Sequence, residues 1–242
     1  MSPPLSDHVA LVTGASRGIG RAVAVRLARA GCRVAGVARS ASDLEQTAQL
    51  AAAEGGAALL AVPADVTSDA ALEDAVRVIR ERLGRITVLI NNAGVAPARG
   101  SVLKTPLLAW DRTLATCLRA PMVLVRLVLP DMLAHGGGAI INIASVAGKH
   151  GRAGEAAYAA AKFGLLGFTQ SLFAEVRAQG IKVTAICPGL VDTAFIPPNK
   201  RVERSRFLQP SDVAEAVYDV LASPARTCPT EIVLEPQYDP EA

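Results

Sequence analysis

The chain has 242 residues, of which 51% are hydrophobic and only 4% aromatic, and its formal net charge is +3. This composition excludes a disordered chain and favours one large core or two small ones. The 25 basic residues form no block of five or six, so bulk charge gives no reason to expect a nucleic-acid partner.

Cysteine usage and hydropathy indicate the cellular setting. The four cysteines form no CxxC pair and no Cys/His group with metal-ligand spacing. We therefore expect reduced thiols, no metal site and a cytoplasmic protein. The N-terminal MSPPLSD lacks the basic and apolar regions of a signal peptide. The most apolar stretch, residues 120–134, contains Arg126, Pro130 and Asp131, so we expect it to be too short and too polar to span a membrane.

Apolar strand patterns alternate with helical patterns along the whole chain. Strands are predicted at residues 8–13, 33–38, 58–62, 87–91, 139–145, 181–186 and 230–235. Helices are predicted at residues 18–31, 42–55, 68–83, 107–134, 154–179 and 211–222, with Ser42 and Glu45 at capping-box spacing in the second. This alternation predicts an α/β fold, a single domain over residues 1–242 whose parallel sheet has helices on both faces.

The stretch TGASRGIG, residues 13–20, joins the first predicted strand to the first predicted helix. Glycines permit a tight turn and a close approach by a ligand, and a helix N-terminus attracts anions. We therefore predict a pyrophosphate site at Gly14, Ser16, Arg17, Gly18, Ile19 and Gly20. The spacing Gly-x3-Gly-x-Gly differs from the usual Gly-x-Gly-x-x-Gly fingerprint, and a turn that serves only the topology is the alternative.

Basic residues at the second predicted strand favour NADP(H) over NAD(H). An NAD enzyme places an acidic residue near the end of that strand, where this chain has Ala38 and Arg39. Arg17 and Arg39 could converge on a 2′-phosphate, which suits their forked donors, although each could also be a solvated surface charge.

Two further segments that follow predicted strands are candidates for cofactor contact. Asp65, followed by Val66, could accept a hydrogen bond from the adenine amino group or could simply begin a turn. The segment Asn91-Asn92-Ala93-Gly94 could pack beside the cofactor or form a plain turn.

Tyr158 and Lys162 are four residues apart, so a helix would present them on one face. A tyrosine hydroxyl has a reference pKa of about 10, and a neighbouring ammonium lowers it. Ser145 precedes the tyrosine by thirteen residues and could hold a substrate oxygen beside it. The three residues predict an acid/base site, with a core tyrosine and a surface lysine as the alternative.

The ordered set TGASRGIG, NNAG, Ser145 with Tyr158-Ala-Ala-Ala-Lys162, and Cys187-Pro188-Gly189 resembles the short-chain dehydrogenase/reductase family over residues 7–236. The resemblance implies a doubly wound Rossmann-type domain and a nicotinamide cofactor. It implies that Tyr158 is the general acid or base, that Lys162 binds the nicotinamide ribose and tunes Tyr158, and that Ser145 orients the substrate carbonyl.

The same resemblance implies further cofactor contacts. These are Asn91, Ala93 and Gly94 beside the cofactor, and Pro188, Gly189 and Thr193 around the nicotinamide, with Thr193 a candidate for the carboxamide. It also suggests a homodimer or homotetramer formed through residues 107–134 and 154–179. We expect a flexible substrate loop at about residues 190–208.

Cys117 stands where many family members carry an asparagine that bends a helix and holds a proton-relay water. A cysteine is a weak hydrogen-bonding residue and cannot replace the amide. Three readings stay open: a working relay through backbone and water, an impaired enzyme, or a redox role for the thiol.

Three functions follow as hypotheses. The first is NADPH-dependent reduction of a hydrophobic ketone or aldehyde, because the expected pocket walls at residues 95–97, 146–151 and 190–207 are mostly apolar. The second is reduction of a 3-oxoacyl thioester, for which the basic segment 200–206 could contact a phosphorylated carrier. The third is a cofactor-binding or interaction protein without catalysis.

Overall fold

The computed structural model describes residues 5–96, 100–196 and 203–238. In these residues the strands are β1 Val9–Thr13, β2 Arg33–Ala38, β3 Leu59–Pro63, β4 Val88–Asn91, β5 Gly138–Ile143, β6 Ile181–Pro188 and β7 Glu231–Leu234. They lie in the order β3-β2-β1-β4-β5-β6-β7, and every neighbouring pair is parallel. The predicted parallel sheet is confirmed.

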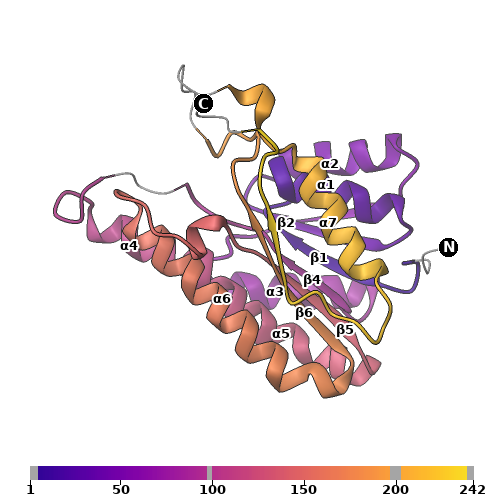
Figure 1. Cartoon of the computed structure of the whole chain (residues 1–242). Helices are drawn as coiled ribbons and strands as arrows, with labels where there is room; N and C mark the ends of the chain where they lie inside the picture. Colours follow the sequence, from indigo (N-terminus) through magenta and orange to yellow (C-terminus); the bar gives the residue numbers. More distant parts are fainter. Residues whose placement is uncertain (1–4, 97–99, 197–202, 239–242) are drawn as a thin grey trace.

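Helices cover both faces of this sheet. They are α1 Gly18–Arg29, α2 Ala41–Ala53, α3 Asp69–Leu83, α4 Leu107–Leu114, α5 Ala120–His135, α6 Ala156–Val176 and α7 Pro210–Ala222. In Figure 1, α1, α2 and α7 lie together on one face, and α3, α5 and α6 lie on the other. This arrangement confirms the doubly wound Rossmann-type fold in one domain.

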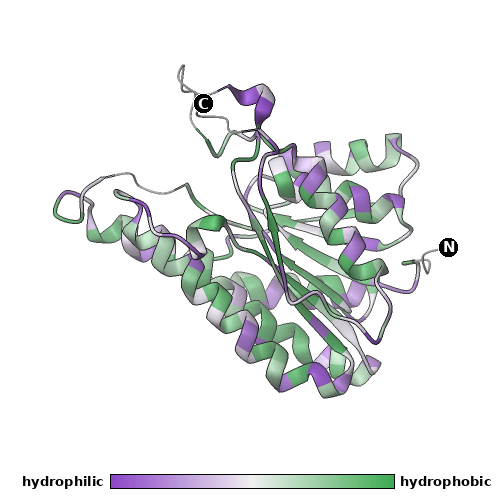
Figure 2. Ribbon diagram, in the orientation of Figure 1, coloured by the Kyte–Doolittle hydropathy of each residue, from purple (hydrophilic) through white to green (hydrophobic). Residues whose placement is uncertain are grey.

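Strand β1 shows why the sequence folds this way. Ala10 and Val12 belong to the core under α1 and α7, whereas Val9 and Leu11 belong to the core under α3 and α5. A strand buried on both faces must be apolar at every position, which is why it reads as an unbroken apolar run. Figure 2 shows the same pattern, with hydrophobic strands at the centre and hydrophilic residues on the outer faces of the helices.

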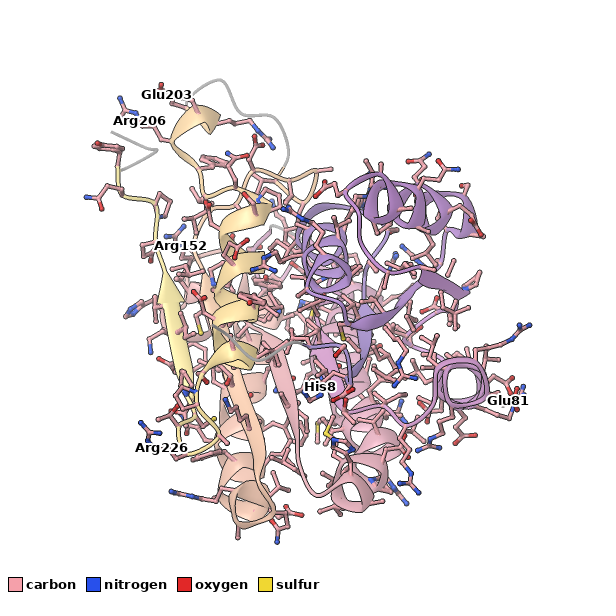
Figure 3. The ribbon with its side chains drawn as sticks, turned by 90° about the vertical axis from the view of Figure 1, so that its right-hand side faces the viewer. His8, Glu81, Arg152, Glu203, Arg206 and Arg226 are labelled. Carbon is pink, nitrogen blue, oxygen red and sulfur yellow. The ribbon has the colours of Figure 1, made fainter. Side chains whose placement is uncertain are left out.

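Charged side chains lie mainly at the periphery. Figure 3 shows Glu81, Glu203 and Arg226 projecting outward, while His8 is half-buried. His8 Nδ1 is 3.0 Å from Thr87 Oγ1, which joins the segment before β1 to the start of β4. The amino ends of these strands are therefore linked by side-chain hydrogen bonds, and the opposite, carboxyl ends are left for a ligand.

The predicted helix 107–134 contains an irregularity that the periodicity does not reveal. A π-helical turn at Ala115–Arg119 connects α4 to α5, and Cys117 lies in that turn. By length and composition the whole segment Leu107–His135 could cross a membrane, as buried helices of globular proteins also can. Here it packs on α3 and α6, and Asp131 accepts hydrogen bonds from Arg80 Nε at 2.9 Å and Ile86 N at 3.1 Å.

Two local predictions are corrected. The N-cap of α2 is Ser40, two residues before the proposed Ser42 cap, because α2 already begins at Ala41; the Ser40 hydroxyl accepts from Asp43 N at 3.2 Å. The strand predicted at residues 181–186 is also longer than expected, since β6 continues to Pro188 in register with Leu234 of β7.

Candidate active site

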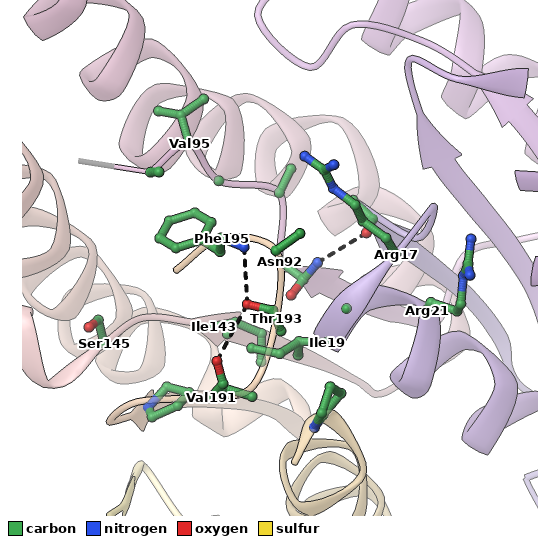
Figure 4. A pocket seen from close by; sticks show the side chains of 18 of the residues that line it. Arg17, Ile19, Arg21, Asn92, Val95, Ile143, Ser145, Val191, Thr193 and Phe195 are labelled. Carbon is green, nitrogen blue, oxygen red and sulfur yellow. Dashed lines mark hydrogen bonds between the residues drawn. The ribbon is translucent and has the colours of Figure 1, made fainter. Parts of the chain in front are cut away.

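A cleft runs across the carboxyl ends of the strands. The strand order reverses between β1 and β4, which is where ligands bind in open α/β sheets. The β1–α1 turn, the ends of β2 and β3 and the residues after β4 line one part of it; Ser145–Ala147, the start of α6 and residues 188–196 line the other. Figure 4 shows Arg17 and Arg21 on the α1 side and Ser145 and Phe195 across the cleft.

The glycine turn is built to receive an anion. Gly14 and Gly18 have φ angles of 66° and 55°, in the region that side chains disfavour. A Cβ on Gly20 would lie 2.2 Å from the backbone oxygen of Gly14, so only glycine fits there. Arg17 provides no side-chain cap for α1, and the first turn of α1 has no acidic residue. The first N–H groups of α1 are therefore available to a pyrophosphate, and these residues fit a dinucleotide.

Asn92 fastens this turn to the end of β4. Its Nδ2 donates to the backbone oxygen of Thr13 at 2.8 Å. In return, Thr13 Oγ1 accepts from the backbone N–H groups of Asn92 and Ala93 at 2.9 and 3.0 Å. The sequence predicted cofactor contact or a plain turn for the segment that contains Asn92, and the hydrogen bonds to Thr13 are a structural role that the NNAG motif alone does not reveal.

Two arginines and one aspartate lie at the adenosine end of the cleft. Arg17 and Arg39 are exposed, line the cleft and have no side-chain hydrogen bond or ion pair in the described part of the chain. Asp65 Oδ1 accepts from the backbone N–H and the hydroxyl of Thr67 at 2.9 and 2.8 Å. These two bonds are the main cause of a lowered Asp65 pKa, so Asp65 is a carboxylate that accepts hydrogen bonds.

Tyr158 and Ser145 meet at the other end of the cleft. Ser145 follows β5 in extended conformation, and its hydroxyl accepts from Ala147 N at 3.1 Å. Tyr158 projects from the first turn of α6, and its ring lies 6.1 Å from that of Phe195. Burial raises the Tyr158 pKa above its usual value, and a hydrogen bond with the Ser145 side chain acts in the opposite direction.

Lys162 is fully enclosed beneath Tyr158. Its Nζ donates to the backbone oxygen of Ile143 at 2.8 Å and lies 5.7 Å from the centroid of the Tyr158 ring. Burial lowers the Lys162 pKa. The expectation that this ammonium lowers the Tyr158 pKa is corrected, because burial of the phenol raises the pKa, the charges of Cys117 and Glu155 act in the same direction, and the opposing hydrogen bond with Ser145 is a smaller cause.

Cys117 lies behind this group. It is buried in the π turn, and its Sγ would be 3.8 Å from a Cβ on Gly94. Its charged form would raise the pKa of Tyr158 and of Lys162, so the thiol is electrostatically close to both. All four cysteines, Cys32, Cys117, Cys187 and Cys228, are free thiols.

The segment predicted as a substrate loop is partly anchored. Val191 pairs with Leu208, and Arg204 Nε donates to Asp192 Oδ1 at 2.8 Å. In the basic segment 200–206, Arg204 is thus held by Asp192 and Arg206 by Glu203. Pro97 and residues 197–202, which were part of the expected pocket wall, lie outside the described residues.

Most predicted site residues meet at this cleft. Those lining it are Gly14, Ser16, Arg17, Gly18, Ile19, Arg39, Asp65, Val66, Ala93, Gly94, Ser145, Tyr158, Lys162, Pro188, Gly189 and Thr193. Gly20, Asn91 and Cys117 lie behind the lining. Asn91, the last residue of β4, is buried and its Nδ2 donates to Asn142 Oδ1 at 2.9 Å, while its own Oδ1 has no hydrogen-bond partner among the described residues. The described residues contain no group of three His, Cys, Asp or Glu side chains able to hold a metal ion.

A dinucleotide cleft at the switch point of a parallel sheet, ending at a Ser, Tyr and Lys group, defines a nicotinamide-dependent oxidoreductase of the Rossmann type. The chain belongs to the short-chain dehydrogenase family, whose model matches residues 8–203.

Relatives and solved structures agree with this assignment. The chain is 43% identical over 207 residues to the 3-oxoacyl-[acyl-carrier-protein] reductase FabG of Pseudomonas aeruginosa, covering 84% of this chain and 82% of that protein. It is 38% identical over 216 residues to the ketoacyl reductase HetN of a Nostoc species, covering 88% and 75%. A metagenomic short-chain oxidoreductase solved in complex with NADP matches with a TM-score of 0.85 and 33% identity, covering 98% of this chain and all of that one. NAD(P) is therefore the cofactor class.

Proposed function

We propose that the chain is an NADPH-dependent carbonyl reductase that converts a ketone or aldehyde to an alcohol, with Tyr158 as the acid/base. The observation that carries the proposal is the arrangement of one cleft: Arg17 and Arg39 line the end suited to a 2′-phosphate, and Ser145, Tyr158 and Lys162 line the other. NADP(H) is proposed over NAD(H) because neither arginine makes a hydrogen bond or ion pair with the residues that the structure describes, and because no acidic side chain ends β2.

The mechanism assigns a task to each side chain. NADPH, if held by the glycine turn, Arg17 and Arg39, would supply the hydride that a carbonyl carbon accepts. The negative charge that develops on the oxygen is met by the hydroxyls of Ser145 and Tyr158, and Tyr158 gives its proton to that oxygen. The raised pKa of Tyr158 keeps the proton in place until then. Lys162, held by Ile143, is proposed to bind the nicotinamide ribose.

The test is reduction of a panel of small ketones with NADPH and with NADH, for wild type and Tyr158→Phe. The variant should lose about 10²- to 10⁴-fold in kcat, the usual contribution of a positioned acid. Its Kd for NADPH should stay within about threefold of wild type, because the phenyl ring remains. Equal turnover by both proteins would contradict the role of Tyr158, and preference for NADH would contradict the cofactor assignment.

Reduction of a 3-oxoacyl thioester is the second candidate, favoured by the names of the FabG and HetN relatives. Competition between the ketone panel and a 3-oxoacyl carrier thioester distinguishes the two. A higher kcat/KM for the carrier thioester than for its free thioester analogue would select this candidate. A phosphorylated carrier would have to use cations other than Arg204, which is engaged by Asp192.

A cofactor-binding protein without turnover is the third candidate, and Cys117 is its support. If NADPH binds and no panel member is reduced, Cys117→Asn should be measured on the same panel. Restored reduction would show that the thiol interrupts a proton path, whereas continued absence of reduction would favour a binding role.

We also propose that the protein is cytoplasmic and assembles as a homodimer or homotetramer. The assembly is supported by the large apolar side chains that α4, α5 and α6 expose.

A further inference from the structure

One face of α4 lies along the cleft. Leu108, Arg112 and Ala115 are four and three residues apart, which places them on the same helix face, and all three line the cleft. The side chain of Arg112 therefore borders the cleft from α4, whereas Arg39 and Asp65 border it from the ends of the strands. The sequence analysis assigned no role to this arginine.

Arg112 and Arg39 both act on Asp65. After the two hydrogen bonds from Thr67, the charges of Arg39 and Arg112 are further causes of the lowered Asp65 pKa. Arg39 directly follows β2 and Arg112 belongs to α4, so cations from two separate segments act electrostatically on this carboxylate.

The guanidinium of Arg112 is also available to a ligand. No hydrogen bond or ion pair to its side chain is present in the described part of the chain. Arg119, two turns further along the same continuous helix, is different, because Nη1 and Nη2 bind Asp69 at 2.5 and 2.6 Å. Arg119 is also absent from the cleft lining, which makes it a matched control for the loss of one positive charge.

The chemistry of this end suits a flat, nitrogen-rich ring. Asp65 can accept from an exocyclic amino group with the carboxylate positions that Thr67 leaves free. The aromatic side chains that line the described cleft are Tyr158 and Phe195, and both lie at the opposite end, near Ser145. A planar guanidinium stacks on an aromatic face, which an aliphatic or ammonium side chain cannot do as well.

We propose that Arg112 is a positioning residue for the adenine of the cofactor, its guanidinium covering the ring from the α4 side while Asp65 accepts from the amino group. The inference rests on the nicotinamide dinucleotide cofactor class of the family and goes beyond the proposed function, which uses only Arg17 and Arg39 at this end. It also separates two tasks: Arg17 and Arg39 bind the 2′-phosphate, and Arg112 binds the base.

The experiment measures Kd by titration calorimetry for NADPH, NADH and ADP-ribose with wild type, Arg112→Gln, Arg112→Lys and Arg119→Gln. Arg112→Gln should raise all three Kd values by a similar factor of about five or more, since each ligand contains adenine. Arg112→Lys should recover only part of the loss, because it restores the charge without the plane. Arg119→Gln should leave every Kd within twofold of wild type.

Three results would overturn the inference. The first is Kd values for Arg112→Gln within twofold of those of wild type. The second is a loss of affinity for NADPH alone, which would place Arg112 on the 2′-phosphate. The third is wild-type affinity for all three ligands in Arg112→Lys. Unaltered thermal melting of the Arg112 variants, compared with Arg119→Gln, excludes loss of folded protein as the cause. Failure of wild type to bind any of the ligands would instead reject the proposed function.

Discussion

Tyr158 and Lys162 show how the surroundings of a side chain in the fold change its pKa. Spacing places Tyr158 and Lys162 on one helix face, but spacing cannot say how much water remains around the phenol. In the folded chain the burial of Tyr158 raises its pKa, and Lys162 donates to Ile143. The raised pKa keeps Tyr158 protonated at neutral pH, which is the form that the proposed carbonyl reduction needs.

This protonation state can be observed directly. The chain has three tyrosines, Tyr158, Tyr218 and Tyr238. Between pH 7 and 10, wild type and Tyr158→Phe should show the same rise in tyrosinate absorbance without cofactor, because a raised pKa keeps Tyr158 protonated in that range. Addition of NADP⁺, whose nicotinamide is cationic, should lower the Tyr158 pKa and make the two curves diverge. An additional tyrosinate in cofactor-free wild type near pH 7 would contradict the assignment.

At the scale of elements, the β1–α1 connection links folding to binding. Its glycines allow the backbone of the turn to touch both Asn92 and the ligand space, and α1 begins inside the turn without a side-chain cap. The element thus has unsatisfied N–H groups where an anion is expected.

A methyl group at Gly20 tests this close packing. Gly20→Ala should destabilise the fold by about 1–3 kcal/mol, because the added Cβ would meet the Gly14 oxygen at 2.2 Å and Asn92 Nδ2 at 2.4 Å. Urea unfolding at a fixed protein concentration measures the change. The matched control is Gly167→Ala in α6, where nothing lies within 4 Å of the new Cβ, and helix propensity predicts a gain of up to about 1 kcal/mol. Equal stability of the two variants would show that the turn has room to relax.

The π turn is the element that periodicity does not reveal. Helical spacing continues across residues 107–134, yet a turn of five residues, Ala115–Arg119, changes the register between α4 and α5. Such a turn depends on what packs against it, here α6 and the residues after β4. It places Cys117 inward, toward Gly94, and leaves Arg112 on the cleft side and Arg119 on the outer side.

For the whole molecule, apolar exposure indicates where a second copy would bind. Met122 of α5 and Phe163 of α6 are 44% and 48% exposed, on the helices that the family resemblance assigns to assembly. Exposed apolar surface of this kind is stabilised when a partner covers it.

A charge at this surface should break the assembly. Phe163→Glu is expected to shift the molar mass in solution from that of a dimer or tetramer toward that of the 25.0 kDa chain, since an unpaired carboxylate in an interface is costly. Light scattering after size exclusion measures the mass. Leu50→Glu, which alters a 43%-exposed leucine of α2 on the other face of the sheet, should leave the mass unchanged. An unaltered mass for Phe163→Glu would place the interface elsewhere.

Much of the candidate site could be predicted because its residues belong to short sequence motifs. TGASRGIG, Tyr158 with Lys162, and Ser145 each act within one local segment whose type follows from periodicity. Asn91 and Asn92 show the limit, since adjacent residues after a strand point to opposite sides. Asn91 is buried against Asn142, and Asn92 holds the glycine turn.

The sequence by itself determined the alternation of strands and helices, the parallel sheet and the order of the motifs, because these depend on hydrophobic period and local turn chemistry. The tertiary structure alone decided the net direction of the Tyr158 pKa, the inward position of Cys117 and the approach of Arg112 to Asp65. Those properties arise where segments distant in sequence exclude water from one another or bring charges together, and no local pattern records such contacts.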